Sequence, residues 1–130
     1  MTTHFDKYFT LKEAQALLLE IKPKVEEITR LKVVLDSKGY DVHKHRYFGG
    51  MGPNGQKIFP FEMERLVEIV TELNQLGVQV KDMNAGLIDF PATRANGEEV
   101  LLCYRLPETE IGYWHTLDGG FAGRRSVTEL

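Results

Sequence analysis

The chain has 130 residues, and its 16 Lys and Arg against 19 Asp and Glu give a formal net charge of −3. This length predicts a single domain. The charge argues against nucleic acid as a ligand, because affinity for phosphate comes from clustered positive charge. The longest wholly apolar run spans only residues 100–104, so no membrane-spanning segment is expected.

The cellular location is indicated by the amino-terminal residues and by the cysteine content. The amino-terminal residues contain no basic stretch followed by an apolar core, so we expect no signal peptide. Cys103 is the single cysteine, which excludes an internal disulfide and fits a reducing compartment. These features predict a cytoplasmic protein.

The first expected helix spans residues 10–38 and starts with a capping box of Thr and Glu side chains. Pro23 predicts either a kink or a break at Lys22. Apolar residues spaced three and four apart form a seam along the helix, which Lys32 interrupts. The seam consists of Leu11, Ala14, Leu18, Ile21, Val25, Ile28 and Leu35.

A second helix is expected over residues 60–76, with a proline at its first position. The stretch between the two helices, 40–59, is rich in glycine and is interpreted as a loop insertion. Two helices with matching apolar faces predict an antiparallel helical hairpin over residues 10–76. The apolar face of the second helix consists of Met63, Leu66, Val67, Val70 and Leu73.

Segments with a preference for extended structure follow the second helix. The dipeptide Asn96-Gly97 is the signature of a two-residue hairpin loop between two of them. These segments are rich in β-branched and aromatic side chains. They lie at residues 78–80, 87–90, 100–105 and 111–115.

Together these elements predict an α+β fold in a single domain over residues 1–130. An antiparallel helical hairpin is packed on a small three-stranded antiparallel meander. The meander occupies residues 78–115, and residues 116–130 form a glycine-rich tail without a clear period.

The alternation of side chains along strands divides the predicted meander into two faces. A two-residue hairpin loop pairs Asp89 with Tyr104, and the next hairpin pairs Leu102 with His115. A one-residue slip in the second turn would move the last strand to the opposite face. The face under the helices is expected to carry Ile88, Phe90, Leu101, Cys103 and Trp114. The opposite, polar face is expected to carry Asp89, Tyr104, Tyr113 and His115.

Several stretches of the chain share the motifs of one family. They are Gly86-Leu-Ile-Asp-Phe-Pro91, Glu99-Val-Leu-Leu-Cys-Tyr-Arg-Leu-Pro-Glu108, Ile111-Gly-Tyr-Trp-His115 and Asp118-Gly-Gly-Phe-Ala-Gly-Arg124. Through them the chain resembles an uncharacterised bacterial family, domain of unknown function 2203. The resemblance implies a bacterial cytosolic protein and supplies no activity, so a site must be argued from the residues.

The polar face of the meander is a candidate site for a small polar or anionic ligand. The carboxylate of Asp89 would raise the pKa of the neighbouring His115 imidazole, so the two groups could share a proton. Guanidinium groups nearby suit carboxylate or phosphate. The alternative is a structural hydrogen-bond network in which the arginines pair with nearby acids. The candidate ligand-binding residues are Asp89, Tyr104, Arg105, Tyr113, His115 and Arg124.

A divalent metal is the one cofactor considered, and no other cofactor is predicted. His115, Asp118 and Glu108 offer an imidazole and two carboxylates, although they follow no recognised ligand spacing. His43 and His45 lie in the loop insertion and are interpreted as part of a solvated loop.

We expect an interaction or scaffold protein that self-associates through its helices, most simply as a homodimer. An unbroken first helix would be about 43 Å long and the second about 25 Å, at 1.5 Å per residue. That difference leaves part of the first seam uncovered. The seam residues expected at the contact are Leu18, Ile21, Val25 and Ile28.

The alternative function is a small-molecule or metal-binding protein, with or without enzymatic activity. It would use the polar sheet face around His115. Nucleic-acid binding is the least expected function, because the net charge is −3.

Overall fold

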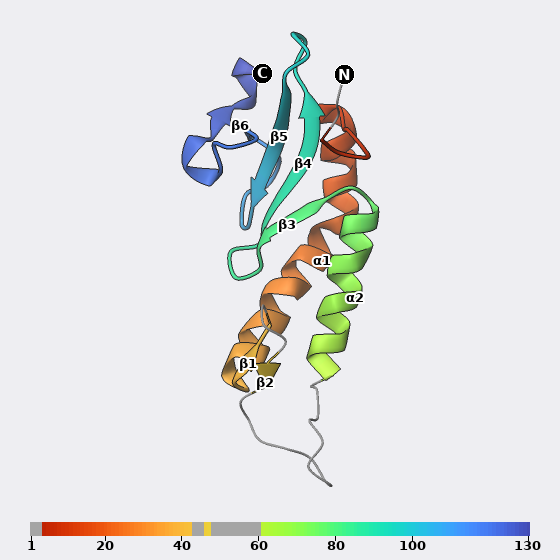
Figure 1. Ribbon diagram of the computed structural model, residues 1–130, viewed down its shortest axis with the longest axis vertical. Coiled ribbons are helices and arrows are strands. Elements are labelled where there is room, and N and C mark those ends of the chain that lie inside the picture. Colours follow the sequence, from red (N-terminus) through yellow and green to blue (C-terminus); the bar gives the residue numbers. More distant parts are fainter. Residues whose placement is uncertain (1–3, 43–45, 48–60) are drawn as a thin grey trace, which may run out of the picture.

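The structure, a computed structural model, describes residues 4–42, 46–47 and 61–130. It has an α+β fold with two helices and a five-stranded antiparallel sheet. Figure 1 shows how these elements are arranged. The two helices lie side by side, and the sheet packs near the start of the first helix. None of the helices in these ranges has the length and apolarity that crossing a membrane requires.

Helix α1, Leu11–Ser37, begins with the predicted capping box. Glu13 N donates to Thr10 Oγ1 at 3.0 Å, and Thr10 N donates to a Glu13 carboxylate oxygen at 2.8 Å. The helix continues through Pro23, so the break considered at Lys22 does not occur. Burial of the apolar seam outweighs the one backbone hydrogen bond that the proline removes.

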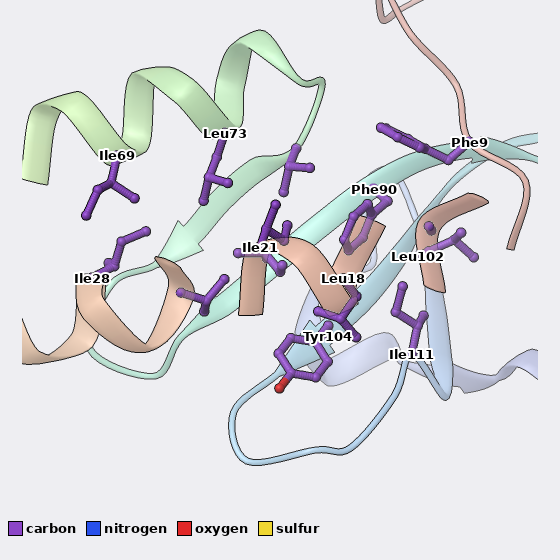
Figure 2. Close-up of a cluster of buried hydrophobic side chains, with 14 of the residues drawn as sticks. Phe9, Leu18, Ile21, Ile28, Ile69, Leu73, Phe90, Leu102, Tyr104 and Ile111 are labelled. Atoms are coloured by element: carbon purple, nitrogen blue, oxygen red, sulfur yellow. The ribbon is translucent and has the colours of Figure 1, made fainter. Parts of the chain in front are cut away.

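The apolar seam of α1 is buried within the chain itself. Leu18, Ile21, Val25 and Ile28 are at most 2% exposed. Figure 2 shows side chains of the second helix and of the sheet pointing at this seam. The seam is therefore not available for the dimer contact that the helix lengths predicted, because the chain covers it. Self-association itself stays a prediction.

Helix α2, Phe61–Gln75, runs antiparallel along α1. Arg65 links the two helices, since its Nε and Nη2 donate to the carboxylate of Glu27 at 2.9 and 3.0 Å. Val67 was predicted on the buried face and is 45% exposed, because Ile69 occupies the inward position in this turn. The buried residues of α2 are Met63, Leu66, Ile69 and Leu73.

The sheet has the strand order β3-β4-β5-β6-β7, and all neighbouring strands are antiparallel. The sheet is therefore larger than the predicted three-stranded meander: the segment at 78–80 was expected to be extended but was not counted among the three strands, and β7 was not predicted. Strand β7 has two residues and lies in the glycine-rich tail, so it leaves no periodic pattern. The strands are β3 Gln79–Asp82, β4 Leu87–Thr93, β5 Glu99–Arg105, β6 Tyr113–Thr116 and β7 Arg125–Ser126.

Short elements complete the described chain. Of the predicted loop insertion, only residues 40–42 and 46–47 are described, and both histidines of that segment lie outside the described residues. The predicted tail is structured, because two 3₁₀ turns flank β7. The short elements are β1 Tyr40–Asp41, β2 Arg46–Tyr47, η2 Phe121–Gly123 and η3 Val127–Glu129.

The loop between β4 and β5 is one residue longer than predicted. Arg94 N donates to Glu98 O at 2.8 Å, which leaves the three residues 95–97 in the loop. Gly97 has φ of 89°, a left-handed conformation that glycine adopts without steric cost. The extra residue places Asp89 opposite Cys103, whereas the prediction placed it opposite Tyr104.

A second shift of one residue occurs in the next hairpin, where His115 pairs with Leu101. The two shifts cancel between β4 and β6, so only β5 presents the face opposite to the predicted one. Figure 2 shows Phe90, Leu102 and Tyr104 together in the core. The inner face, toward the helices, carries Ile88, Phe90, Leu102, Tyr104 and Trp114. The outer face carries Asp89, Leu101, Cys103, Tyr113 and His115.

Candidate metal centre

Three side chains with potential metal-ligand atoms meet on the outer face of the sheet. Asp89 comes from β4, Cys103 from β5 and His115 from β6, which are neighbouring strands. One ligand atom from each residue lies within 4.8 Å of the other two. The residues are 2%, 0% and 3% exposed, so the cluster is fully enclosed by protein.

The hydrogen bonds of His115 determine which ring nitrogen carries a proton. Nδ1 lies 2.7 Å from the backbone oxygen of Thr116. A carbonyl oxygen only accepts, so Nδ1 must donate. In the neutral ring Nε2 is therefore an acceptor, and it lies 3.1 Å from Oδ2 of Asp89, which is also an acceptor when ionised. This contact requires a positive charge or a proton between the two atoms.

Without a metal, a proton can occupy that position. The hydrogen bond to Asp89 raises the pKa of His115, although burial acts in the opposite direction. The metal-free contact is then a proton held between Nε2 and Oδ2, two atoms of side chains that are almost completely buried.

The thiol of Cys103 is protonated in the metal-free protein. Burial, followed by the charge of Asp89, raises its pKa to about 12. The imidazole does not activate it as a base, because one nitrogen of His115 faces Thr116 and the other faces Asp89. This arrangement is unsuited to a cysteine nucleophile, which needs a lowered pKa and a basic neighbour.

Asp89 retains an unused acceptor inside the cluster. Its Oδ1 is buried and accepts no hydrogen bond from the nitrogen or oxygen atoms that the structure describes, and the neighbouring donor that interacts with Asp89 is the protonated thiol of Cys103. An unsatisfied buried acceptor costs about 1–3 kcal/mol, and more when it is charged. A ligand that takes this oxygen would remove the cost.

The cover over the cluster includes a stacked arginine. The guanidinium carbon of Arg124 lies 4.0 Å from the ring centre of Tyr113 and 4.7 Å from that of Phe121. Its Nη2 donates to both carboxylate oxygens of Glu108, at 2.9 and 2.7 Å. The guanidinium carbon of Arg105 lies 5.8 Å from the ring centre of Phe121.

The structure brings together some of the predicted site residues. Asp89, Tyr113 and His115 share a face, as predicted. Tyr104 does not join them, because the shifted β5 turns it into the core and Cys103 takes its place. Arg124 pairs with an acid, in line with the alternative of a structural network.

The predicted metal ligands other than His115 lie elsewhere. Glu108 is paired with Arg124 and also accepts from the backbone N of Arg105 at 2.7 Å. Asp118 is exposed and accepts from Oγ1 of Thr116 at 3.0 Å. Sequence reasoning missed Cys103 as a ligand, because the length of the β4–β5 loop alone determines its face.

One comparison with known proteins gives a match. A family model described as "Uncharacterized conserved protein (DUF2203)" matches residues 7–127. The matched range includes all three strands of the Asp89–Cys103–His115 cluster. Comparisons with curated proteins and with solved structures gave no match.

Proposed function

The chain belongs to the DUF2203 family of uncharacterized conserved proteins, and from the geometry of its sheet we propose that it is a metal-binding protein. The metal centre is formed by Asp89, Cys103 and His115. The observation that carries the proposal is the contact between Nε2 and Oδ2, two acceptors that face each other beside a thiol. A divalent cation placed among them satisfies all three groups.

The donor set favours a borderline-soft transition metal. A thiolate, an imidazole nitrogen and a carboxylate oxygen are the ligand types that Zn²⁺ takes in proteins. Mg²⁺ and Ca²⁺ prefer oxygen ligands alone. We therefore propose Zn²⁺, with Co²⁺ as its spectroscopic substitute.

The orientation of His115 matches that of a metal-ligating histidine. Its Nδ1–H donates to the Thr116 carbonyl at 2.7 Å, which leaves the Nε2 lone pair directed into the cluster. Such a bond from the second ring nitrogen is the usual way in which a ligating histidine is held. The ring therefore needs no rotation to bind a metal.

The distances between the ligand atoms of the cluster also suit a zinc ion. Two ligand atoms at about 2.1 Å from a tetrahedral zinc are roughly 3.4 Å apart. Nε2 and Oδ2 are 3.1 Å apart, and every pair of ligand atoms in the cluster is within 4.8 Å. With a zinc–sulfur bond of about 2.3 Å, the thiolate sulfur would lie roughly 3.6 Å from each of the other two ligand atoms.

The location follows from the same chemistry. A centre that depends on one unpaired thiol works best where thiols stay reduced. We therefore propose the cytoplasm, a reducing compartment, as the site of action.

Self-association, the function expected first from the sequence, has less support. The seam of α1 is buried in the chain, and the exposed apolar residues of α1 include Leu19 and Val33, which are 76% and 62% exposed. Charged residues between them, Lys22, Glu26 and Arg30, interrupt any continuous apolar stripe. Isolated exposed apolar residues are normal on a soluble surface.

A titration of reduced, metal-free protein with Co²⁺ tests the proposal. We expect one equivalent to bind, with a thiolate-to-cobalt charge-transfer band. Cys103→Ser should remove that band, and Asp89→Asn and His115→Gln should weaken binding by ten- to a hundredfold or more. His4→Gln, at an exposed histidine, is the matched control and should bind like the wild type. A folded wild type that binds neither Co²⁺ nor Zn²⁺ would overturn the proposal.

A further inference from the structure

Arg124 carries an unused donor beside the proposed centre. Its Nε is buried and has no hydrogen-bond partner within the described ranges of the chain, although Nη2 is fully engaged by Glu108. The guanidinium is held in place from two sides, by that carboxylate and by the rings of Tyr113 and Phe121. A buried and rigidly held N–H group of this kind is able to donate a hydrogen bond to a ligand that lies beside it.

The register places this donor next to the thiol. Tyr113 is the direct partner of Cys103 across β5 and β6, so the two side chains lie side by side on the outer face. Arg124 stacks on the ring of Tyr113 and therefore lies over the same part of the sheet. The positive charge of Arg124 also acts to lower the pKa of Cys103, which is consistent with this proximity.

The proposed centre has one coordination position left for such a ligand. Asp89, Cys103 and His115 supply three protein atoms. Zinc centres with three protein ligands hold a solvent oxygen in the fourth position. A metal-bound water or hydroxide carries lone pairs that accept a hydrogen bond from a guanidinium.

We propose that Arg124 holds the fourth ligand of this centre, a water or hydroxide that small monovalent anions can replace. This inference rests on the proposed metal binding. Nε donates to the ligand, while Glu108 and the two aromatic rings fix the guanidinium above it. The site then takes a metal together with a small anionic ligand.

Access to the fourth position is limited to small ligands. The three protein ligands are almost completely buried, whereas Tyr113 and Phe121 are 42% and 47% exposed. The two rings that hold the guanidinium therefore reach solvent, and Arg124 itself is paired with Glu108. A triatomic anion such as azide can enter if this pair shifts, and a larger anion would have to displace the aromatic rings.

A titration of Co²⁺-loaded protein with azide at constant ionic strength tests the inference. In the wild type, azide should change the d–d absorption of the cobalt. Arg124→Gln should weaken azide binding at least tenfold, because a charged hydrogen bond to the ligand is lost. Arg125→Gln is the matched control, since Arg125 pairs with Trp114 on the inner face, and it should respond like the wild type.

A second variant covers a failure of Arg124→Gln to fold. Arg124→Lys keeps the charge for Glu108 and removes Nε, so we expect azide binding weaker than in the wild type, with Co²⁺ still bound. No response to azide in Co²⁺-loaded wild type, or a wild-type response in Arg124→Gln or Arg124→Lys, would overturn this inference alone. Failure of the wild type to bind Co²⁺ would overturn the metal centre as well.

Discussion

The Nε2 atom of His115 lies 3.1 Å from Oδ2 of Asp89, while its Nδ1 already donates to a backbone carbonyl. The backbone contact fixes the tautomer, so the pair cannot consist of a neutral imidazole and a free carboxylate. Either a shared proton or a metal ion must occupy the contact. The two states differ in their response to pH and to metal, which makes them separable by experiment.

In metal-free protein, His115 should titrate above its unfolded-state pKa of about 6.5. The hydrogen bond to Asp89 raises the pKa of this imidazole more than burial lowers it. NMR titration of the ring signals measures the value directly. Asp89→Asn should lower the pKa, because the charged acceptor is lost and burial remains. A wild-type pKa below the unfolded value would contradict the ion pair.

The raised pKa of His115 also predicts how the stability of the metal-free fold depends on pH. A raised folded-state pKa stabilises the fold fully below the unfolded pKa, and this contribution is lost as pH rises through the folded pKa. Urea unfolding of the wild type should therefore show a lower free energy of unfolding above the folded-state pKa of His115 than below its unfolded-state pKa. His115→Gln should lack this component, and its persistence in the variant would assign it to other groups.

The thiol of Cys103 should react slowly in the folded, metal-free protein. It is completely buried, and burial together with Asp89 raises its pKa to about 12. Labelling with a thiol reagent should be slow in buffer and fast in denaturant. Immediate stoichiometric labelling of folded protein would show that the cover over the cluster is open.

Tyr104→Phe should leave the fold intact and stabilise it by about 1 kcal/mol. The hydroxyl is buried among core side chains and has no hydrogen-bond partner in the described part of the chain, so its removal relieves an unmet desolvation cost. Urea unfolding measures the change. Co²⁺ affinity should be unaltered, and a loss of Co²⁺ binding would place Tyr104 in the site after all.

Ile28→Glu should unfold the chain rather than dissociate a dimer. Ile28 is 1% exposed within the chain, so the substitution buries an unpaired charge in the core at a cost of several kcal/mol. Circular dichroism of Ile28→Glu should show loss of structure. Light scattering measures the mass of the variant and of the wild type. A folded Ile28→Glu with half the wild-type mass would instead support a dimer through the α1 seam.

The helical part of the fold could be predicted from local signals. The capping box at Thr10 and Glu13 and the three-four spacing of the seam depend on neighbouring residues, and the structure contains both. The course of the helix through Pro23 could not be predicted, because the packing that stabilises it comes from distant segments.

The sheet faces could be predicted only in part. Asp89 and His115 were placed on one face correctly, since the two register shifts cancel between their strands. Cys103 was misplaced because a single extra residue in the β4–β5 loop turns all of β5 over. The position of Arg124 depends on β7, a strand too short to be detected by periodicity.

X-ray absorption at the zinc edge of Zn²⁺-loaded protein tests the metal centre most directly. The account predicts one sulfur at about 2.3 Å together with nitrogen and oxygen ligands at about 2.0–2.2 Å. In Cys103→Ser, the sulfur contribution should disappear. A zinc shell of nitrogen and oxygen alone in the wild type, or no bound zinc, would contradict the centre of Asp89, Cys103 and His115.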